Sequence, residues 1–311
     1  DSLATRLPAI IERADARTFE RYLSFFASHI RNRNTRDAYA AAAKRCFRWC
    51  EDHGIHDLHA VTRLHIAAYI EDMTNSHSAP TVKQHLAGLR MLFAYLGVPR
   101  DNPAEGVRGP KHIVRTGRTP VLAAEEARRL LESIPIETDA GRRDRALIGL
   151  MVYTFARVSA VIGVRIGDYY LQGRRRWVRL SEKGGRQHAV PVHHKAEEYV
   201  DAYLERLTAR GVPSPGQPLL RTIDRHGAIT DRPMSRFIAW EVVKRRAAAA
   251  GIPLETTNHT FRATGITVYL ENGGTIENAR LIAAHASIKT TQTYDRRREA
   301  VTLNEINRIL I

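Results

Sequence analysis

The chain has 311 residues, enough for one large domain or two moderate ones, and 43% of them are hydrophobic. That apolar share supports a folded core and excludes a wholly disordered chain. Lys and Arg number 48 against 33 Asp and Glu, which gives a formal charge of +15. A surplus of this size favours a polyanionic partner, with nucleic acid the commonest candidate and an acidic membrane the second.

The sequence contains no apolar run long enough to span a membrane, and its start, DSLATRLPAIIERADARTFERYL, lacks the uninterrupted apolar core of a signal peptide. We therefore expect a soluble protein of the cytoplasm, associated with the nucleoid if it binds DNA. The two cysteines, Cys46 and Cys50, stand four residues apart with no second Cys pair. This pattern favours small buried hydrophobic residues over a zinc site, and we expect no metal or other cofactor.

The first 108 residues carry apolar patterns of helical period and predict a small helical bundle. We expect one helix over about 17–31, one that Thr35 caps and that runs to about residue 50, one near 64–73, and one that Thr81 opens and that ends near residue 96. Basic residues fall on the outer faces of these helices, where each alone could be ordinary solvated surface. On a chain this basic we expect them to contact DNA: Lys44, Arg45, Arg48, Lys83 and Arg90.

A segment without sustained apolar period separates this bundle from the rest of the chain. Residues 97–120, GVPRDNPAEGVRGPKHIVRTGRTP, are rich in Gly, Pro and Arg. The pattern predicts a helical domain over 1–108, a basic linker over 109–120 and a second domain over 121–311. The linker adds Lys111, Arg115 and Arg118 to the residues expected to bind DNA.

The second domain is predicted to be mostly helical with a small antiparallel sheet near its start. The segments RRRWVRLS and HAVPVH predict two strands joined at residues 184–185, a hairpin with Lys183 at its tip. Later helices are expected over about 195–210, 233–250, 260–271, 276–284 and 288–297, with Ser287 capping the last. The predicted fold class is therefore mainly α, with two domains.

Six polar residues of the second domain stand where the secondary structure is expected to change: Arg157, Lys183, His259, Arg262, His285 and Tyr294. Arginine pairs with phosphate oxygens through two hydrogen bonds, and two arginines can neutralise a pentacoordinate phosphorus. Tyrosine is a nucleophile once its proton is accepted, and Lys or His can protonate a departing oxygen. No acidic cluster for Mg²⁺ accompanies the set, which therefore predicts metal-free phosphoryl transfer through a phosphotyrosine.

The order of these residues resembles the tyrosine recombinase (phage integrase) family, and most closely its Xer-like bacterial members. The resemblance rests on TFARVSAVIGVRIGD, the Lys183 hairpin, HTFR and AHASIKTTQTY, in that order. TRDAYAAAAKRCFRWCEDHG and TVKQHLAGLRMLFAYLGVPRDNPAEGV are similar to the core-binding domain of the family. The resemblance covers nearly the whole chain.

This resemblance implies a site-specific DNA recombinase that cuts and rejoins strands through a 3′-phosphotyrosine and a Holliday junction, without metal or ATP. The outcome would be integration, excision, resolution or cassette exchange, as in mobile elements. The resemblance also implies the roles. Tyr294 would attack the phosphate, Arg157 and Arg262 would clamp its oxygens, Lys183 would protonate the leaving 5′-oxygen, His259 would take the tyrosine proton, and His285 would hydrogen-bond the phosphate.

Three positions depart from the family pattern. Ala160 stands where an acidic residue usually follows the first arginine by three places and supports it, which bears on the orientation of Arg157. Phe261 replaces a commoner Leu, and Ala284 replaces the usual Gly before His285. We expect Phe261 and Ala284 to alter only the local side-chain packing.

The tail LNEINRILI, residues 303–311, places Leu303, Ile306 and either Ile309 or Leu310 on one helical face. It predicts packing on its own domain or, as the resemblance implies, docking into a neighbouring subunit of a tetramer on DNA. Two other functions stay open. A type IB topoisomerase uses nearly the same residues, and a non-catalytic integrase-like DNA-binding protein would fit Ala160. A metal-dependent nuclease ranks below both, because no carboxylate cluster accompanies the basic residues. The target DNA sequence and any accessory proteins are not encoded in these patterns.

Overall fold

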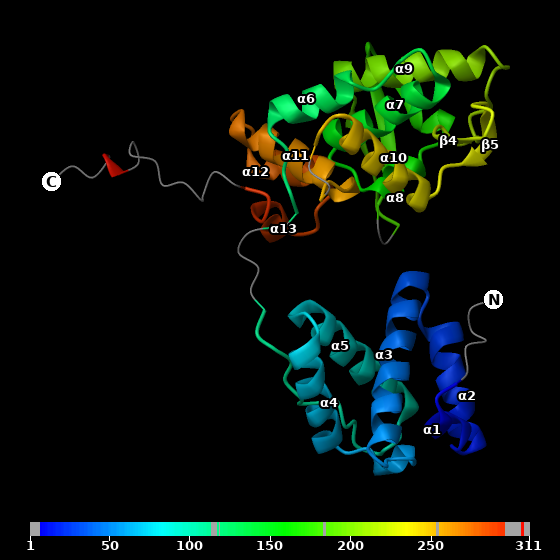
Figure 1. Cartoon of the computed structure of the whole chain (residues 1–311), viewed down its shortest axis with the longest axis vertical. Helices are drawn as coiled ribbons and strands as arrows, with labels where there is room; N and C mark the ends of the chain where they lie inside the picture. The colour runs from blue at the N-terminus through cyan, green and yellow to red at the C-terminus, as the bar shows by residue number, and fades with distance from the viewer. Residues whose placement is uncertain are drawn as a thin grey trace. The chain divides into compact units, whose positions relative to one another are not determined.

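A computed structural model describes residues 7–112, 117, 119–182, 185–252, 255–295 and 306–307. Contacts divide the chain into two units, residues 1–113 and 114–311. Both units are mainly helical, and within the described ranges the second alone contains β-sheet (Figure 1). The predicted fold class, two mostly helical domains with a small antiparallel sheet, is confirmed.

The first unit is a bundle in which α3 packs against α5. Aromatic and aliphatic side chains at helical spacing, such as Phe47 of α3 and Leu89 and Phe93 of α5, are fully buried between the helices. Cys46 and Cys50 are also buried, as predicted, and they form no disulfide. The elements are α1 (Ala9–Glu12), α2 (Ala16–Ser24), the π-helical turn η1 (Phe25–His29), α3 (Arg33–Asp52), the 3₁₀ turn η2 (Leu58–Ala60), α4 (Arg63–Ser76) and α5 (Ala79–Leu96).

Two helices of the first unit begin earlier than the sequence predicted. Asn32, rather than Thr35, caps α3, because the Asn32 side chain accepts a hydrogen bond from the Thr35 backbone N–H. Helix α5 begins at Ala79 with Pro80 in its first turn, where proline needs no N–H partner, rather than at Thr81. In both helices the predicted threonine lies closer in sequence to the buried apolar residues than the residue at which the helix actually begins.

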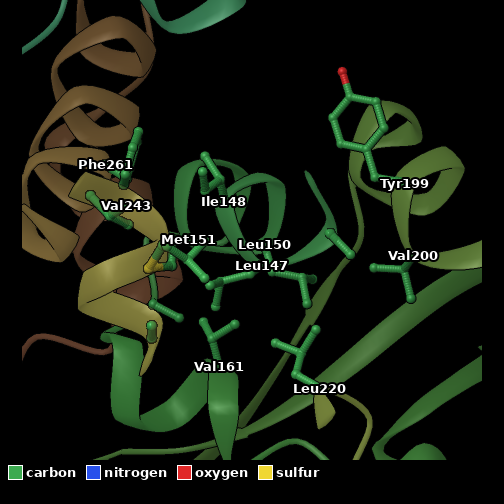
Figure 2. Packing of buried hydrophobic residues seen from close by; sticks show 14 of the residues in the cluster. Leu147, Ile148, Leu150, Met151, Val161, Tyr199, Val200, Leu220, Val243 and Phe261 are labelled. Atoms are coloured by element: carbon green, nitrogen blue, oxygen red, sulfur yellow. The ribbon is translucent and has the colours of Figure 1, made fainter. Parts of the chain in front are cut away.

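Helix α7 (Asp139–Tyr153) is the central helix of the second unit. Its Leu147, Ile148 and Met151 lie in one buried cluster with Val243 and Phe261 (Figure 2). The helices that pack against α7 include α6 (Ala124–Glu132), α8 (Val158–Ile162), α9 (His194–Thr208), α10 (Arg236–Ala249) and α11 (Asn258–Glu271). Helices α12 (Ile276–Ile282) and α13 (Ile288–Gln292) follow, and α12 packs on α11.

The described residues of the second unit form two small antiparallel sheets. One has the order β1–β2–β3, from β1 (Tyr169–Gln172), β2 (Arg175–Ser181) and β3 (Gln187–Pro191), and it follows the 3₁₀ turn η3 (Ile166–Asp168). The other pairs β4 (Arg221–Ile223) with β5 (Ile229–Pro233). The β2–β3 hairpin was predicted, whereas β1, β4 and β5 were missed because they are short and mostly exposed or half-buried. Lys183 and Gly184, at the predicted tip, lie outside the described residues.

Helix α13 is shorter than the predicted 288–297. It ends at Gln292, so Tyr294 follows the helix instead of lying within it. The Ser287 side chain accepts a hydrogen bond from the Lys289 backbone N–H, which confirms the predicted cap. Of the predicted tail helix, Ile306 and Asn307 are described and the other residues of 303–311 lie outside the described ranges. Helices in the described part of the chain are too short or too polar to cross a membrane.

Candidate active site

Arg262 is a fully buried cation near the start of α11, with 1% of its surface exposed. Its guanidinium donates hydrogen bonds to the carbonyl oxygens of Phe155 and, at 2.8 Å, of Ala283. Burial lowers the pKa of Arg262, and the nearby Arg157 lowers it further, whereas Tyr294 and Glu182 act in the opposite direction. A buried cation with a second cation beside it is an environment that favours an anionic ligand.

The position of Arg262 depends on a close contact between α11 and the end of α7. A Cβ on Gly265 of α11 would lie 2.2 Å from the Val152 carbonyl oxygen and 2.7 Å from the Phe155 ring, so only glycine fits. Phe155 has a φ of 54°, a left-handed conformation that side-chain-bearing residues rarely adopt. This turn presents the Phe155 carbonyl to the Arg262 guanidinium. The arginine is therefore fixed by backbone groups from two segments distant in sequence.

Arg157 and Arg262 share one buried carboxylate, that of Glu182. Arg157 precedes α8, and its Nη1 donates to Oε2 of Glu182 at 2.5 Å. The other oxygen, Oε1, lies 3.9 Å from Nη1 of Arg262 and has no hydrogen-bond partner among the described residues. The Glu182 side chain is 2% exposed, against 34% for that of Arg157. Glu182 was not among the residues predicted from the sequence, although its position directly before the hairpin tip and Lys183 is a signal of a role at the site.

His285 is buried directly after α12, and one of its ring nitrogens has no partner. Nδ1 lies 2.9 Å from the Thr291 hydroxyl, while Nε2 makes no hydrogen bond with any described residue. The ring stacks on Tyr294, with centroids 5.7 Å apart and planes at 11°. Burial, aided by Arg262 and Arg157, lowers the pKa of His285 to about 3, so the ring is neutral at pH 7. A buried polar atom without a partner indicates a ligand atom or water at that point.

The chain reverses at the end of α12 in a way that orients His285. The Ala284 N–H bonds to the Leu281 carbonyl at 3.1 Å, and the His285 N–H bonds to the Arg280 carbonyl at 3.0 Å. This is a Schellman motif, in which the residue at the Ala284 position is left-handed and usually glycine. Ala284 has a φ of 48°. The expectation that Ala284 alters only the local side-chain packing was therefore wrong, because the alanine instead places strain on the backbone.

Tyr294 and His259 form the more accessible part of the site. Tyr294 is half-buried, and its carbonyl oxygen accepts a hydrogen bond from the Thr267 hydroxyl at 3.0 Å. His259, in the first turn of α11, is exposed. Desolvation by the surrounding chain, together with Arg262, Arg157 and Arg236, lowers the pKa of His259 below its ordinary value. His259 is thus neutral at pH 7 and able to accept a proton.

Five of the six residues selected from the sequence are thus brought together: Arg157, His259, Arg262, His285 and Tyr294. Lys183 lies outside the described residues. Within the ranges that the structure describes, no group of three or more His, Cys, Asp or Glu side chains could hold a metal ion. The arrangement can bind a phosphate through its two arginines and present a tyrosine hydroxyl to it.

The residues predicted to bind DNA occupy different settings. Arg45 and Arg48 are exposed on α3 and Lys83 on α5, while Lys44 is half-buried and Lys111 is exposed beyond α5. The Arg90 guanidinium donates to the carbonyl oxygens of Ala104, at 3.2 Å, and Val107, and so fastens the segment after α5 to that helix. Arg115 and Arg118 lie outside the described residues. DNA contact by this set stays a prediction.

Known proteins share the sequence pattern of this chain over most of its length. Residues 120–300 match the phage integrase family, and residues 17–97 match the N-terminal SAM-like domain of phage integrases. The tyrosine recombinase XerD of Mycobacterium leprae is 31% identical over 279 residues, covering 84% of this chain and 86% of the relative. XerD of Corynebacterium glutamicum is 29% identical over 276 residues, with the same coverage of 84% and 86%.

Solved structures share the fold. XerH bound to a palindromic difH substrate in a post-cleavage complex superposes with a TM-score of 0.73 at 17% identity, covering 98% of this chain and 97% of XerH. A lambda integrase from a tetramer bound to a Holliday junction gives a TM-score of 0.69 at 20% identity, covering 92% of this chain and 78% of the integrase. With arginines, histidines and a tyrosine gathered at one site and the family matched over most of the sequence, the chain belongs to the phage integrase family and is a tyrosine site-specific recombinase.

Proposed function

We propose that this recombinase cleaves and rejoins DNA strands through a 3′-phosphotyrosine and exchanges them through a Holliday junction. The observation that carries the proposal is the pair of clustered arginines beside a buried histidine nitrogen that has no partner among the described residues. A scissile phosphate at this point would pair with Arg157 and Arg262 and satisfy Nε2 of His285. The phosphate would come from the DNA backbone.

His285 is suited to donate a hydrogen bond to the phosphate. Its low pKa keeps the ring neutral, so one nitrogen carries a proton and the other accepts. If the Thr291 hydroxyl donates to Nδ1, the proton resides on Nε2, the nitrogen without a partner. The neutral Nε2–H then donates to a non-bridging oxygen and adds to the stabilisation of the pentacoordinate phosphorus by the arginines.

The chemical step is an exchange of ester bonds at phosphorus. The Tyr294 oxygen attacks and forms a bond to phosphorus, while the bond to the 5′-oxygen breaks. The phenolic proton passes to neutral His259, and Lys183 gives a proton to the departing 5′-oxygen. The number of ester bonds is unchanged, so the 5′-hydroxyl of another strand can reverse the step and release Tyr294 without ATP.

The charge and the relatives support the proposed substrate and assembly. Solved relatives include XerH with its difH DNA and a lambda integrase tetramer with a Holliday junction. We propose double-stranded DNA for this chain as well, bound by a core-binding domain over 1–108, the basic linker over 109–120 and a catalytic domain over 121–311. The formal charge of +15 supports this assignment.

A cavity of about 490 Å³ in the second unit is a candidate acceptor for the tail. Its wall is mainly apolar and includes Val152, Tyr199, Val268 and Ile282. The apolar stripe of residues 303–311 has matching chemistry, and the occupant we propose is the tail of a neighbouring subunit in a tetramer. Removing residues 303–311 should then lower strand exchange far more than the first cleavage step.

A nicked suicide DNA from the ends of the element that encodes the chain tests the function. Incubated with the protein in the presence of a chelator, it should give a covalent adduct on a denaturing gel. Tyr294→Phe should abolish the adduct, while Tyr269→Phe, which alters another half-buried tyrosine of the same apolar cluster, should keep it. Absence of an adduct on DNA that the protein binds would contradict the proposal. Relaxation of supercoiled DNA that lacks the site would instead indicate a topoisomerase.

A further inference from the structure

The structure provides Arg157 with a carboxylate from an unexpected element. The sequence has Ala160 where the resemblance implied an acid, and Ala160 is the third residue of α8, whose first turn follows Arg157 directly. Its methyl group is buried and carries no charge. The carboxylate that binds Arg157 instead comes from Glu182, 25 positions along the chain, at the end of β2.

We propose that Glu182 is a positioning residue that holds Arg157 and Arg262 for the scissile phosphate, replacing from the β2–β3 hairpin the acid missing at position 160. The inference rests on the proposed function and deepens it. A carboxylate between two guanidinium groups offsets their mutual repulsion, and its geometry fixes the direction of the arginine that it binds. Glu182 therefore sets the arginine geometry before DNA arrives.

The contacts of Glu182 distinguish it from a purely structural ion pair. Asp144, a fully buried carboxylate in α7, binds Arg143, Arg245 and Arg246 through both of its oxygens. Glu182 in contrast uses Oε2 for Arg157, while Oε1 has no hydrogen bond from the described residues. A carboxylate needed only for the fold would stabilise it more with hydrogen bonds to both oxygens, as at Asp144.

The geometry leaves room for the phosphate beside the carboxylate. One nitrogen of Arg157 binds Glu182, and the side chain stays about one-third exposed, so its other N–H groups can face DNA. The backbone also fixes Glu182, because its N–H bonds to the Arg186 carbonyl at 2.7 Å and its carbonyl accepts the Gly185 N–H at 3.2 Å. Since Lys183 is the next residue, Glu182 ties the hairpin with the proposed general acid to the arginine pair.

The test measures single-turnover adduct formation on suicide DNA over a range of DNA concentrations. Glu182→Gln keeps the size of the side chain and removes its charge. We expect the adduct rate at saturating DNA to fall by about 10- to 100-fold, the scale found when a residue that orients a metal ligand is lost. The DNA concentration at half-saturation should stay within about twofold, because the basic surface is untouched. If Glu182 had only a structural role, its loss would not lower the adduct rate while leaving the DNA concentration at half-saturation unchanged.

Asp168→Asn is the matched control. Asp168, in η3, forms an ion pair with Arg179 of β2 at 3.1 Å, so the variant removes a carboxylate bound to the same sheet without touching either site arginine. It should react at the wild-type rate. The double variant Ala160→Glu with Glu182→Gln restores an acid on α8 and should recover part of the lost rate. Thermal unfolding of each variant checks the fold.

Glu182→Asp covers the case in which the Gln variant does not fold. It keeps the charge but draws the carboxylate back from Arg157, and its adduct rate should also fall with unchanged half-saturation. An unchanged or faster rate in a folded Glu182 variant would overturn the inference, because Glu182 would then be inert or would compete with the phosphate. Failure of the wild-type protein to form an adduct on bound DNA would overturn the proposed function as well, so the two failures are distinguishable.

Discussion

The two units of the molecule differ in what they bury. Within the described residues of the first unit, buried polar side chains are few, and Tyr69 and His85 bond each other at 3.0 Å. The second unit buries Asp139, Asp144, Arg262, Glu182 and His285 among others. A helical bundle needs no such groups for stability, since burying a charge is unfavourable unless it is paired. The buried charged groups therefore belong to the unit that contains the candidate active site, whereas the first unit presents exposed basic residues.

The buried charges of the second unit fall into two groups. Asp139 binds Arg206 at 2.6 Å and Arg210 at 2.7 Å, and Asp144 is bound by arginines on both oxygens. Around Arg157 and Arg262, in contrast, Oε1 of Glu182 and Nε2 of His285 have no partner among the described residues. Carboxylates whose two oxygens are both hydrogen-bonded stabilise the fold, whereas the free ring nitrogen of His285 indicates a site whose remaining partner is a ligand.

Loss of one of these fully hydrogen-bonded carboxylates should have the largest effect on stability. Asp144→Asn removes the charge that Arg143 and Arg246 share, and leaves these two largely buried arginines without their counter-ion. We expect the free energy of unfolding to fall by about 3–5 kcal/mol. Chemical denaturation measures this change. A loss below about 1 kcal/mol would contradict the view that the fully hydrogen-bonded buried charges stabilise the fold.

Changing an arginine of the candidate active site should affect chemistry more than folding. Arg262→Lys keeps a charge but loses the planar fork that bonds two carbonyls and, as proposed, a phosphate. We expect adduct formation on suicide DNA to slow by roughly 10²–10³-fold, as when a donor to the transition state is removed. DNA affinity, measured by gel shift, should change little. An equal loss of affinity and rate would contradict a role confined to the transition state.

The buried histidine makes stability depend on pH. The folded chain holds the pKa of His285 at about 3, below its ordinary 6.5. Between these pH values the unfolded chain therefore binds a proton at His285 that the folded chain does not bind. The stability due to neutral His285 is complete above pH 6.5 and is lost as pH falls toward 3. By pH 5 the loss should be about 2 kcal/mol. His285→Gln should flatten this part of the pH–stability curve, and a curve identical to wild type would contradict the shift.

The smallest expected effect concerns the strained turn before His285. Ala284→Gly places a residue without a Cβ at a φ of 48° and should relieve the strain. The gain is reduced by the greater freedom of glycine in the unfolded chain, so we expect stabilisation of about 0.5–1 kcal/mol. Thermal unfolding measures it. Ala286→Gly, two residues on, is the control and should stabilise nothing.

Local patterns predicted most helices, the β2–β3 hairpin and five of the residues that gather at the site. A helical apolar period and a hairpin turn are each determined by residues close together in sequence. They did not reveal Glu182, whose meaning depends on contacts with Arg157 and Arg262 across distant segments. The left-handed conformation of Ala284 was missed because it depends on where α12 ends. The short strands β1, β4 and β5 escaped prediction because pairing, rather than an apolar pattern, defines them.

The most direct test of the account is the chemical identity of the protein–DNA linkage. Trypsin should release the peptide TTQTYDR, residues 290–296, which contains Tyr294 as its single tyrosine. After nuclease digestion of the adduct, mass spectrometry should find this peptide joined to a nucleotide through a 3′-phosphate, and the cleaved DNA should carry a free 5′-hydroxyl that a polynucleotide kinase labels directly. A linkage at another residue, or one to a 5′-phosphate, would contradict the account.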